Sequence, residues 1–241
     1  KLAIMQPYIF PYIGYFQLMS AVDLFIFYDD VNFIKQGWIN RNDLLMQGKG
    51  HQFVVPLEDA SSFKQIREVR LSGHAFVIWR SKFLRTMAQS YGKAPEFINV
   101  KALVEQVLHS PAVTIADLAI ESLLAVHAYL DLSCKVVKAS ESFPRDRAHG
   151  QERVLEICMK AGATTYINAI GGMELYDQAS FKQKGVELAF LKPMPRAYSQ
   201  FQHPFVPWLS IIDVLMFNDK AKVKEMLATY QLVKDEQRAE G

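Results

Sequence analysis

The sequence predicts an α/β fold in which helices cover a parallel sheet. Short apolar runs of the kind buried in parallel sheets recur along the chain, as at 24–28. Between them lie segments whose apolar residues repeat at helical spacing. In the last third strand and helix alternate, and Gly162 and Gly185 each follow a helix and precede a strand. Because such strand-helix-strand units need right-handed crossovers, the pattern favours a Rossmann-like sheet over a sandwich or a bundle.

The opening of the chain reads as strand, loop, helix and strand. Pro7 and Pro11 exclude a helix from 6 to 11, since proline fixes its own backbone and pushes the preceding residue toward extended geometry. Helical spacing begins at Ile13, and the run 24–28 is the second strand. Open α/β sheets place ligands in the loop between first strand and first helix. We therefore expect a binding site in the Tyr-, Gln- and Pro-rich loop that precedes Ile13.

The middle of the chain is predicted to be mostly helical. A small β excursion is expected first, at 52–56 and 65–71, where β-branched residues are frequent. Three helices are then expected over 74–91, 96–109 and 114–130, the last with Thr114 as its cap. The helical region 74–132 is expected to pack on the sheet or to form a lid beside it, within a single α/β domain spanning 1–241.

The last third is predicted to return to the sheet. Strands are expected at 135–139, 164–167 and 186–191. Helices are expected at 152–161, 179–184, 209–217 and 220–232. Ser210 is the expected N-cap of the helix at 209–217, and Asp213 reinforces a start that resembles a capping box. The sheet therefore draws on the first and last thirds, with the helical middle inserted between them.

Composition excludes several classes of protein. The chain has 241 residues, half of them hydrophobic, and 27 basic against 25 acidic residues, so no global field argues for nucleic acid or a membrane surface. No apolar run approaches the roughly 18 to 20 residues of a membrane helix. Cys134 and Cys158 lack CxxC spacing and are expected to be reduced thiols, which suits the cytoplasm. No metal-ligand spacing is present, so no metal is expected, and without a Walker or GxGxxG motif the cofactor stays unknown.

The stretch from Tyr12 to Tyr15 stands where the nucleotidyltransferase superfamily carries its HxGH signature. There the histidines contact phosphate and the glycine, here Gly14, lets the nucleotide approach the backbone. Tyrosines replace both histidines, and because tyrosine is neutral at pH 7 the transition-state charge loses a strong partner. The resemblance supports a nucleotidyltransferase-like (HUP-like) topology more than it supports nucleotidyl transfer. The competing interpretation is that Tyr8, Tyr12 and Tyr15 pack under the sheet.

A second polar loop follows the second strand at the same edge of the sheet. Asp29 and Asp30 are adjacent, so only one of them is expected to face the site, to bind a hydroxyl, orient an amine or act as a general base. Lys35 and Arg41 are candidates for holding phosphate. Trp38 between them offers a stacking face for a base or a sugar. The competing interpretation of the charged residues is a solvated surface.

Two later loops supply the remaining candidates. Asn168, Gly171 and Gly172 follow a predicted strand, and a Gly-Gly pair permits positive backbone dihedrals and exposes amides that can cradle an anion. An ordinary turn is the alternative. His203 lies in a polar, proline-rich segment, where it would serve as an acid or base or simply form a turn.

Four stretches, in order and over nearly the whole chain, resemble the WbqC-like family. They are Met5 to Phe16, Asp29 to Asn42, Tyr166 to Asp177 and Leu209 to Asn218. Members of that family often accompany surface-polysaccharide and O-antigen gene sets. The resemblance therefore implies modification of a nucleotide-linked sugar.

Residues and resemblance together predict an enzyme that attaches a small acyl or aminoacyl group to an amino sugar on a nucleotide diphosphate. The proton-transfer candidates are Asp29, Asp30 and His203. The substrate-binding candidates are Gln6, Tyr8, Tyr12, Gly14, Tyr15, Lys35, Trp38, Asn40, Arg41, Asn168, Gly171 and Gly172. The alternatives are a nucleotidyltransferase with a degenerate HxGH motif and a non-catalytic module that binds a nucleotide sugar or a partner protein. The expected partners are a nucleotide-linked sugar and an acyl or aminoacyl donor, aminoacyl-tRNA included, while the oligomeric state stays open.

Overall fold

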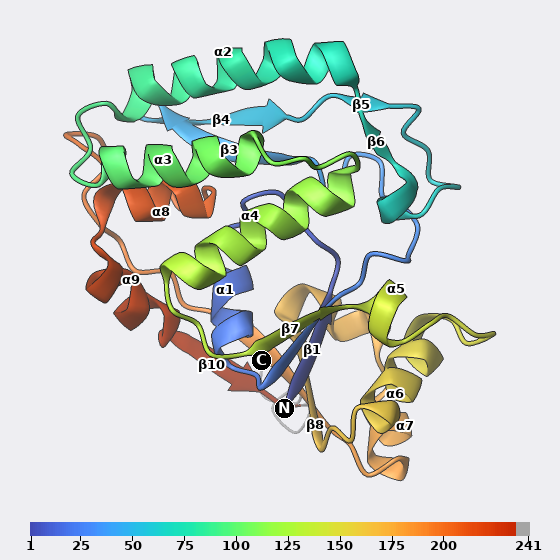
Figure 1. Cartoon of the computed structure of the whole chain (residues 1–241). Helices are drawn as coiled ribbons and strands as arrows, with labels where there is room; N and C mark the ends of the chain where they lie inside the picture. The colour runs from blue at the N-terminus through green and yellow to red at the C-terminus, as the bar shows by residue number, and fades with distance from the viewer. Residues whose placement is uncertain (235–241) are drawn as a thin grey trace.

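The computed structural model describes residues 1–234 and contains one central sheet of six strands (Figure 1). The strands are β1 (Leu2–Met5), β2 (Leu24–Phe27), β7 (Lys135–Lys138), β8 (Thr165–Ala169), β9 (Glu187–Pro193) and β10 (Tyr230–Val233). Their order across the sheet is β10-β9-β8-β1-β2-β7. All neighbours are parallel except β10, which is antiparallel to β9. The predicted α/β fold is confirmed, but the sheet is mixed rather than wholly parallel.

The strand order reverses at the centre of the sheet. The chain moves from β1 outward through β2 to β7, and then returns to the other side of β1 to lay down β8 and β9. Counted along the chain, the sheet strands are in the order 3-2-1-4-5-6 of doubly wound nucleotide-binding folds. In open α/β sheets ligands bind outside the carboxyl ends of the strands at such a reversal. The loops that follow β1, β2 and β8 therefore meet where a site is expected.

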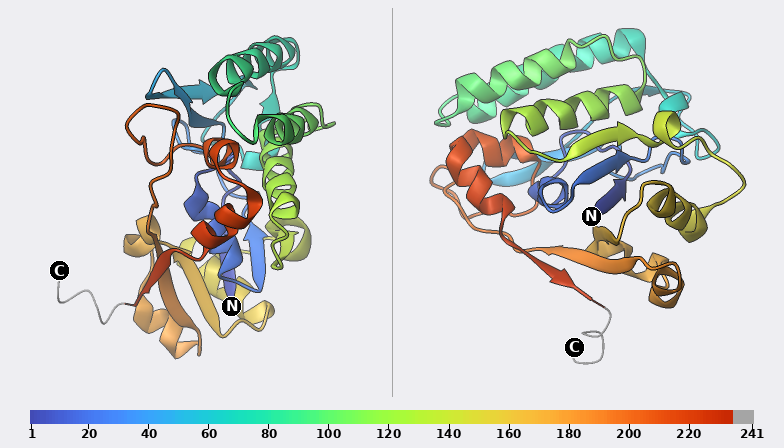
Figure 2. Two further views of the ribbon diagram at one scale, coloured as in Figure 1. Left: turned by 90° about the vertical axis from the view of Figure 1, so that its left-hand side faces the viewer. Right: turned by 60° about the horizontal axis from the view of Figure 1, so that its bottom comes forward.

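Helices cover both faces of the sheet (Figure 2). Alternate strand residues enter two separate cores, since successive side chains point to opposite faces. The first core takes Ala3, Phe25, Ile167 and Ala189, and the second takes Ile4, Ile26, Tyr166 and Leu188. The first contains residues of α1 (Ile13–Ser20), α4 (Ile115–Tyr129), α8 (Ile211–Phe217) and α9 (Lys220–Leu227). The second contains residues of α6 (Gly150–Lys160) and α7 (Gln178–Gln183).

The middle of the chain adds two hairpins and two long helices. The hairpins pair β3 (Arg41–Met46) with β4 (Lys49–Val54), and β5 (Leu57–Glu58) with β6 (Arg70–Leu71). A short 3-10 helix η1 (Ile66–Glu68) precedes β6, and α2 (Gly73–Tyr91) and α3 (Phe97–Leu108) follow it. Helices α2, α3 and α4 have the predicted extents to within two residues, and Thr114 caps α4 by accepting a hydrogen bond from the Asp117 N–H at 3.2 Å. Strand β3 was not predicted, because its buried Leu44 and Leu45 lie within a stretch that is otherwise polar.

The predicted helix at 220–232 is wrong in its second half. Helix α9 ends at Leu227, and the chain then forms β10 along the edge of β9. Sheet pairing satisfies backbone groups that would otherwise be left open along that edge, and it overrides the helical pattern. Two short elements complete the chain, α5 (Ala139–Ser142) and the 3-10 helix η2 (Ile170–Leu175). Among the described helices, none combines the length and apolar character needed to cross a bilayer.

Candidate functional site

An open pocket of about 340 Å³ lies at the carboxyl edge of the sheet. Four segments build it: the loop after β1, the segment from Trp38 into β3, the start of η2, and the stretch after β9. We call it the aromatic pocket. Its lining residues are Tyr8, Pro11, Tyr12, Trp38, Asn42, Asp43, Ile170, Pro193, Pro207 and Trp208. The predicted ligand loop before Ile13 thus forms one wall of a composite site.

Phe10 holds this loop in place. Its backbone is in the left-handed region, with φ of 40°. Its carbonyl accepts hydrogen bonds from Asn42 Nδ2 at 2.8 Å and from Ser210 Oγ at 2.7 Å, and its N–H donates to Ser122 Oγ at 3.1 Å. These contacts offset the cost of a non-glycine residue at positive φ. They join the loop to β3, to α4 and to the start of α8, and so fix the backbone of the loop between Tyr8 and Tyr12.

The three candidate tyrosines do not all face the pocket. Tyr15 is buried and its hydroxyl donates to the Gln6 carbonyl at 2.9 Å, so it serves the loop rather than the pocket. Tyr8 and Tyr12 line the pocket, and burial raises the pKa of both phenols. The Tyr12 ring lies over Gly14, where an added Cβ would come within 2.4 Å of it. Gly14 therefore makes room for a side chain of the protein itself.

Two tryptophans stand at the mouth of the pocket. Trp38, predicted as a stacking residue, is half-exposed and belongs to the lining. Trp208, which the sequence did not single out, packs edge-on against Tyr12 with ring centroids 5.9 Å apart. Its φ is 64°, which is an outlier for an aromatic residue. Backbone strain of this kind persists only where the surroundings enforce it, and it gathers at ligand sites.

Asp43 places a carboxylate in the aromatic pocket. It lies on β3, and within the part of the chain that the structure describes its side chain makes no hydrogen bond or ion pair. Its neighbour Asn42 accepts the Asp43 N–H at 2.8 Å, which fixes the backbone there. The sequence offered one signal, a charged residue two positions after Arg41 in a stretch rich in recognition residues. That signal was missed because β3 was not predicted.

The basic and amide candidates of the same segment lie around the pocket rather than in it. Asn40 is buried and donates to the Val55 carbonyl at 2.9 Å. Arg41 is half-buried, and its Nε has no partner among the described residues. Lys35 is exposed.

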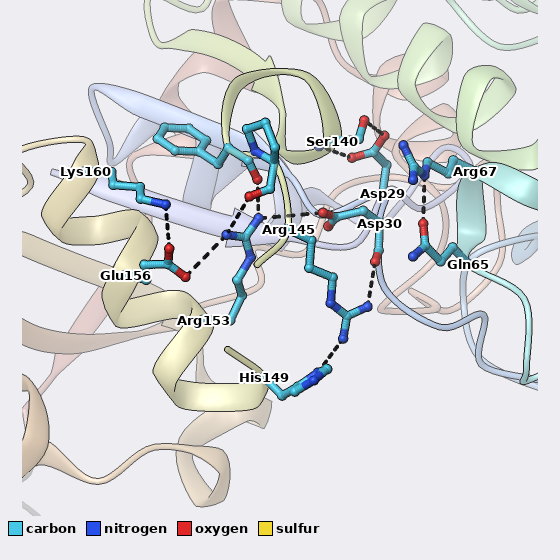
Figure 3. Close-up of polar contacts among 12 residues, drawn as sticks. Asp29, Asp30, Gln65, Arg67, Ser140, Arg145, His149, Arg153, Glu156 and Lys160 are labelled. Atoms are coloured by element: carbon cyan, nitrogen blue, oxygen red, sulfur yellow. Dashed lines mark hydrogen bonds and ion pairs between the residues drawn. The ribbon is translucent and has the colours of Figure 1, made fainter. Parts of the chain in front are cut away.

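Asp29 and Asp30 are both buried beside α5 and α6 (Figure 3). The Asp29 carboxylate accepts hydrogen bonds from the backbone N–H, at 3.0 Å, and the hydroxyl of Ser140. One Asp30 oxygen lies 3.6 Å from the Arg153 guanidinium, yet neither Asp30 oxygen has a hydrogen-bond donor among the described residues. Burial and the Asp29 charge raise the pKa of Asp30, against the lowering effect of Arg153. Neither aspartate lines the aromatic pocket.

The glycine pair does not form the predicted anion cradle. Gly171 and Gly172 lie in η2, and neither has positive φ. A Cβ on Gly172 would come within 2.6 Å of Asn168 Nδ2, whereas one on Gly171 would meet nothing within 4 Å. Asn168 itself is buried, and its Oδ1 accepts the Ala169 N–H at 2.8 Å. Gly172 is therefore needed for packing against Asn168, while the adjoining Ile170 reaches the pocket.

His203 lies elsewhere. It is exposed and packs over the β3–β4 turn, where an added Cβ on Gly48 would come within 2.8 Å of its ring. With Met46 and Phe201 it lines a second depression of about 260 Å³. The structure thus keeps this histidine apart from Asp29, Asp30 and the aromatic pocket.

Ser210 caps α8 as predicted, by accepting the Ile212 N–H at 3.3 Å. The predicted capping box is wrong, because the Ser210 N–H donates to the Asp43 carbonyl at 2.9 Å and not to the Asp213 side chain. The wholly buried Asp213 carboxylate accepts hydrogen bonds from Tyr91 Oη at 2.8 Å, Tyr198 Oη at 2.6 Å and Gln200 Nε2 at 2.7 Å. Burial raises the pKa of Asp213, and the three donors oppose that rise. The network holds the segment after β9, which carries Trp208. Among residues 1–234 no group of three or more His, Cys, Asp or Glu side chains has the arrangement of a metal site.

Comparison with known proteins connects the chain to a family. The model of the WbqC-like protein family matches residues 6–225. The chain is also 30% identical over 232 residues to the uncharacterized protein Rv1507c of Mycobacterium tuberculosis, a match that covers 94% of this chain and 97% of the relative. No solved structure matches the chain. The chain belongs to the WbqC-like protein family, and its aromatic pocket lies within the matched residues.

Proposed function

We propose that this protein is an enzyme of surface-polysaccharide (O-antigen) biosynthesis that transfers a small acyl or aminoacyl group to a nucleotide-linked amino sugar. The family is often linked to O-antigen biosynthesis. The observation that carries the proposal is a free carboxylate, Asp43, in an aromatic pocket at the reversal point of a doubly wound sheet. Both cysteines are buried and unpaired, and we place the protein in the cytoplasm, where thiols stay reduced.

The pocket suits a nucleotide sugar by size and by surface. Its volume falls within the about 300 to 1,000 Å³ that is usual for small-molecule sites. Trp38 and Trp208 offer flat faces for a base or a sugar ring, and Tyr8 and Tyr12 offer hydroxyls as well. Lys35 and Arg41, which lie around the pocket, are the candidates for the diphosphate, with the arginine contributing a forked donor.

In the proposed reaction the sugar amine attacks the carbonyl carbon of an activated acyl ester or thioester. A C–N bond forms, the ester C–O or thioester C–S bond breaks, and the leaving oxygen or sulfur takes up a proton. A carboxylate beside the amine would accept the proton that the nitrogen loses. Asp43 lies in the pocket and is the candidate for that role, whereas Asp29, Asp30 and His203, which the sequence predicts for it, lie outside the pocket.

The test uses the purified chain with dTDP-linked amino sugars and a panel of donors, namely acyl-CoA thioesters and aminoacyl-tRNA, with mass spectrometry of the products. We expect an acylated nucleotide sugar, and a loss of kcat by about 100-fold or more in Asp43→Asn with sugar binding retained. Asp146→Asn changes an exposed aspartate outside the pocket and serves as the control. Sugar binding without product from any donor would overturn the proposal in favour of a non-catalytic binding module.

Nucleotidyl transfer with a HUP-like topology is the second candidate, favoured by the strand order and by Tyr12 at the N-terminus of α1. Two observations argue against this activity. Tyr15 is buried and its hydroxyl donates to the Gln6 carbonyl, and the Tyr12 ring fills the space above Gly14 where a nucleotide would approach the backbone. Pyrophosphate release from ATP or CTP that depends on Tyr12 would support this activity. Its absence alongside sugar acylation would exclude it.

A further inference from the structure

The aromatic pocket carries a single charge. Among the described residues that line it, Asp43 alone has a charged side chain. Burial raises the pKa of Tyr8 and of Tyr12, so both phenols are neutral at pH 7. Lys35 and Arg41 do not belong to the lining, and within residues 1–234 the Asp43 carboxylate forms no ion pair or hydrogen bond. The pocket therefore has a negative charge that no described cation pairs with.

Hydrogen bonds at the start of α8 hold Asp43 next to the aromatic loop. The Asp43 carbonyl accepts from the Ser210 N–H at 2.9 Å, and the Pro11 carbonyl accepts from the Ile211 N–H at 2.8 Å. Two consecutive residues of the chain thus fix both β3 and the loop that leads into Tyr12. The carboxylate and the Tyr12 ring therefore enter one pocket from neighbouring backbone segments.

Four aromatic rings share this pocket with the carboxylate, those of Tyr8, Tyr12, Trp38 and Trp208. Trp208 lies shortly before Ser210 in the chain and packs against Tyr12 with ring centroids 5.9 Å apart. The face of an aromatic ring is negative and attracts a cation within about 6 Å of its centre, and tryptophan is the strongest partner. A carboxylate among such rings favours a cationic ligand over a neutral or an anionic one.

We propose that the aromatic pocket is a cation site that binds the amino sugar through its ammonium group. This inference rests on the proposed function for the identity of the ligand, and it adds the charge and the orientation in which the ligand binds. A primary ammonium has three N–H donors to satisfy. Asp43 offers two carboxylate oxygens, and the Tyr12 hydroxyl, which has no hydrogen-bond partner among the described residues, offers a further acceptor. These acceptors suit a primary ammonium better than a quaternary one, which has no N–H.

The charge of Asp43 also sets the orientation of the nucleotide sugar. A diphosphate beside this carboxylate would be repelled, so the sugar enters with its amine first and its phosphates stay outside, where Lys35 and Arg41 are the available cations. The ammonium loses two protons in the reaction. One passes to Asp43 and frees the nitrogen lone pair for attack, and the other goes to the leaving oxygen or sulfur. The product is a neutral amide, so it is held less tightly than the substrate.

The test measures binding without any acyl donor, by tryptophan fluorescence. The ligands are a dTDP-linked amino sugar, the same sugar with a hydroxyl in place of the amine, and its N-acetyl form. We expect the amino sugar to bind about tenfold more tightly than either neutral sugar, the combined effect of a partly exposed ion pair and a cation–π contact. Equal affinities for the amino and hydroxy sugars would overturn the inference and leave the proposed function standing. Binding of none of the three would count against the proposed function, and glucosamine compared with glucose would then test the cation site alone, where equal binding or none overturns it.

Variants of Asp43 locate the effect. Asp43→Asn should still bind both the amino and the hydroxy sugar through the aromatic rings, but with equal affinity, whereas Asp43→Glu keeps the charge and should keep part of the preference. Trp38→Leu removes a half-exposed ring and should weaken binding of the amino sugar more than that of the hydroxy sugar. Asp146→Asn removes an exposed carboxylate outside the pocket and should leave the preference unchanged. A preference that survives both Asp43→Asn and Trp38→Leu would overturn the assignment of the cation site.

Discussion

Tyr198 donates a hydrogen bond of 2.6 Å to the buried carboxylate of Asp213, and with it the segment after β9 is anchored to helix α8. The Gln200 amide donates to the same carboxylate. It also holds the backbone of Val206, because Gln200 Oε1 accepts from the Val206 N–H at 2.6 Å and Gln200 Nε2 donates to the Val206 carbonyl at 3.1 Å. The segment between these contacts and α8 carries Trp208. The position of Trp208 therefore depends on the Asp213 carboxylate, which does not line the aromatic pocket.

Asp213→Asn should loosen this anchor. An asparagine keeps one acceptor oxygen and replaces the other with an NH₂ donor, which would face Tyr91, or Tyr198 and Gln200, all of them donors. We expect the free energy of unfolding to fall by about 1–3 kcal/mol, as measured by urea denaturation. Asp131→Asn removes an exposed carboxylate that pairs with Lys220 and Lys224 and should change stability very little. Equal effects of the two substitutions would show that the Asp213 network is not an anchor.

Ligand binding should be visible in tryptophan fluorescence. The chain has three tryptophans, and two of them, Trp38 and Trp208, line the aromatic pocket. Trp79 stacks between Phe76 and Phe83 away from it. A nucleotide sugar that stacks in the pocket should change the emission of wild type and of Trp79→Phe, and this change should shrink in Trp38→Phe and in Trp208→Phe. Trp208→Ala should weaken affinity about tenfold, because it removes a stacking face; a signal carried by Trp79 alone would place the ligand elsewhere.

Gly171→Ala and Gly172→Ala form a matched pair. An added methyl group at Gly172 meets the buried Asn168 amide at 2.6 Å, whereas at Gly171 it meets nothing within 4 Å. Gly172→Ala should lower the free energy of unfolding by about 1 kcal/mol or more, the cost of forcing atoms into a packed region. Gly171→Ala should leave the thermal midpoint nearly unchanged. If both variants lower the stability equally, or neither does, the close contact between Asn168 and Gly172 does not limit the residue at position 172.

Asp30 and Asp177 should give stability a pH dependence of opposite sign. Burial and the charge of Asp29 raise the pKa of Asp30, so its protonated form favours the native state, and that contribution is lost as pH rises through the raised pKa. Hydrogen bonds from Ser180 lower the pKa of Asp177, so its contribution is present above the unfolded value of about 4 and is lost as pH falls. The stability of wild type minus that of Asp30→Asn should therefore fall with rising pH, and the corresponding difference for Asp177→Asn should rise. Urea denaturation at a series of pH values measures both differences in the free energy of unfolding. If the two differences change with pH in the same direction, the pKa of Asp30 is not raised in the native state.

Local patterns were enough to predict most of the elements. Pro7 and Pro11 cannot lie in a helix interior, and the Thr114 cap depends on contacts within one turn, so α1 and α4 could be placed from the sequence. Strand β3 and the edge strand β10 could not. Each gains its stability from a partner strand that the pattern of the segment itself does not contain.

The candidate site, too, could be predicted in part from local patterns and in part only from the tertiary structure. By itself the sequence determined that a stiff, aromatic loop follows the first strand and that a second recognition segment with Trp38 follows the next, because strand ends and prolines are local features. Only the tertiary structure decided that Asp43 and Trp208 complete the pocket while Tyr15, Asp29 and Asp30 are buried in supporting contacts. Ser210 reaches the Phe10 carbonyl across 200 residues of chain, and no local periodicity encodes a contact at that separation. The reason is physical: the side chain that faces a cavity is set by packing among distant segments, whereas the pattern that forms each segment is set within it.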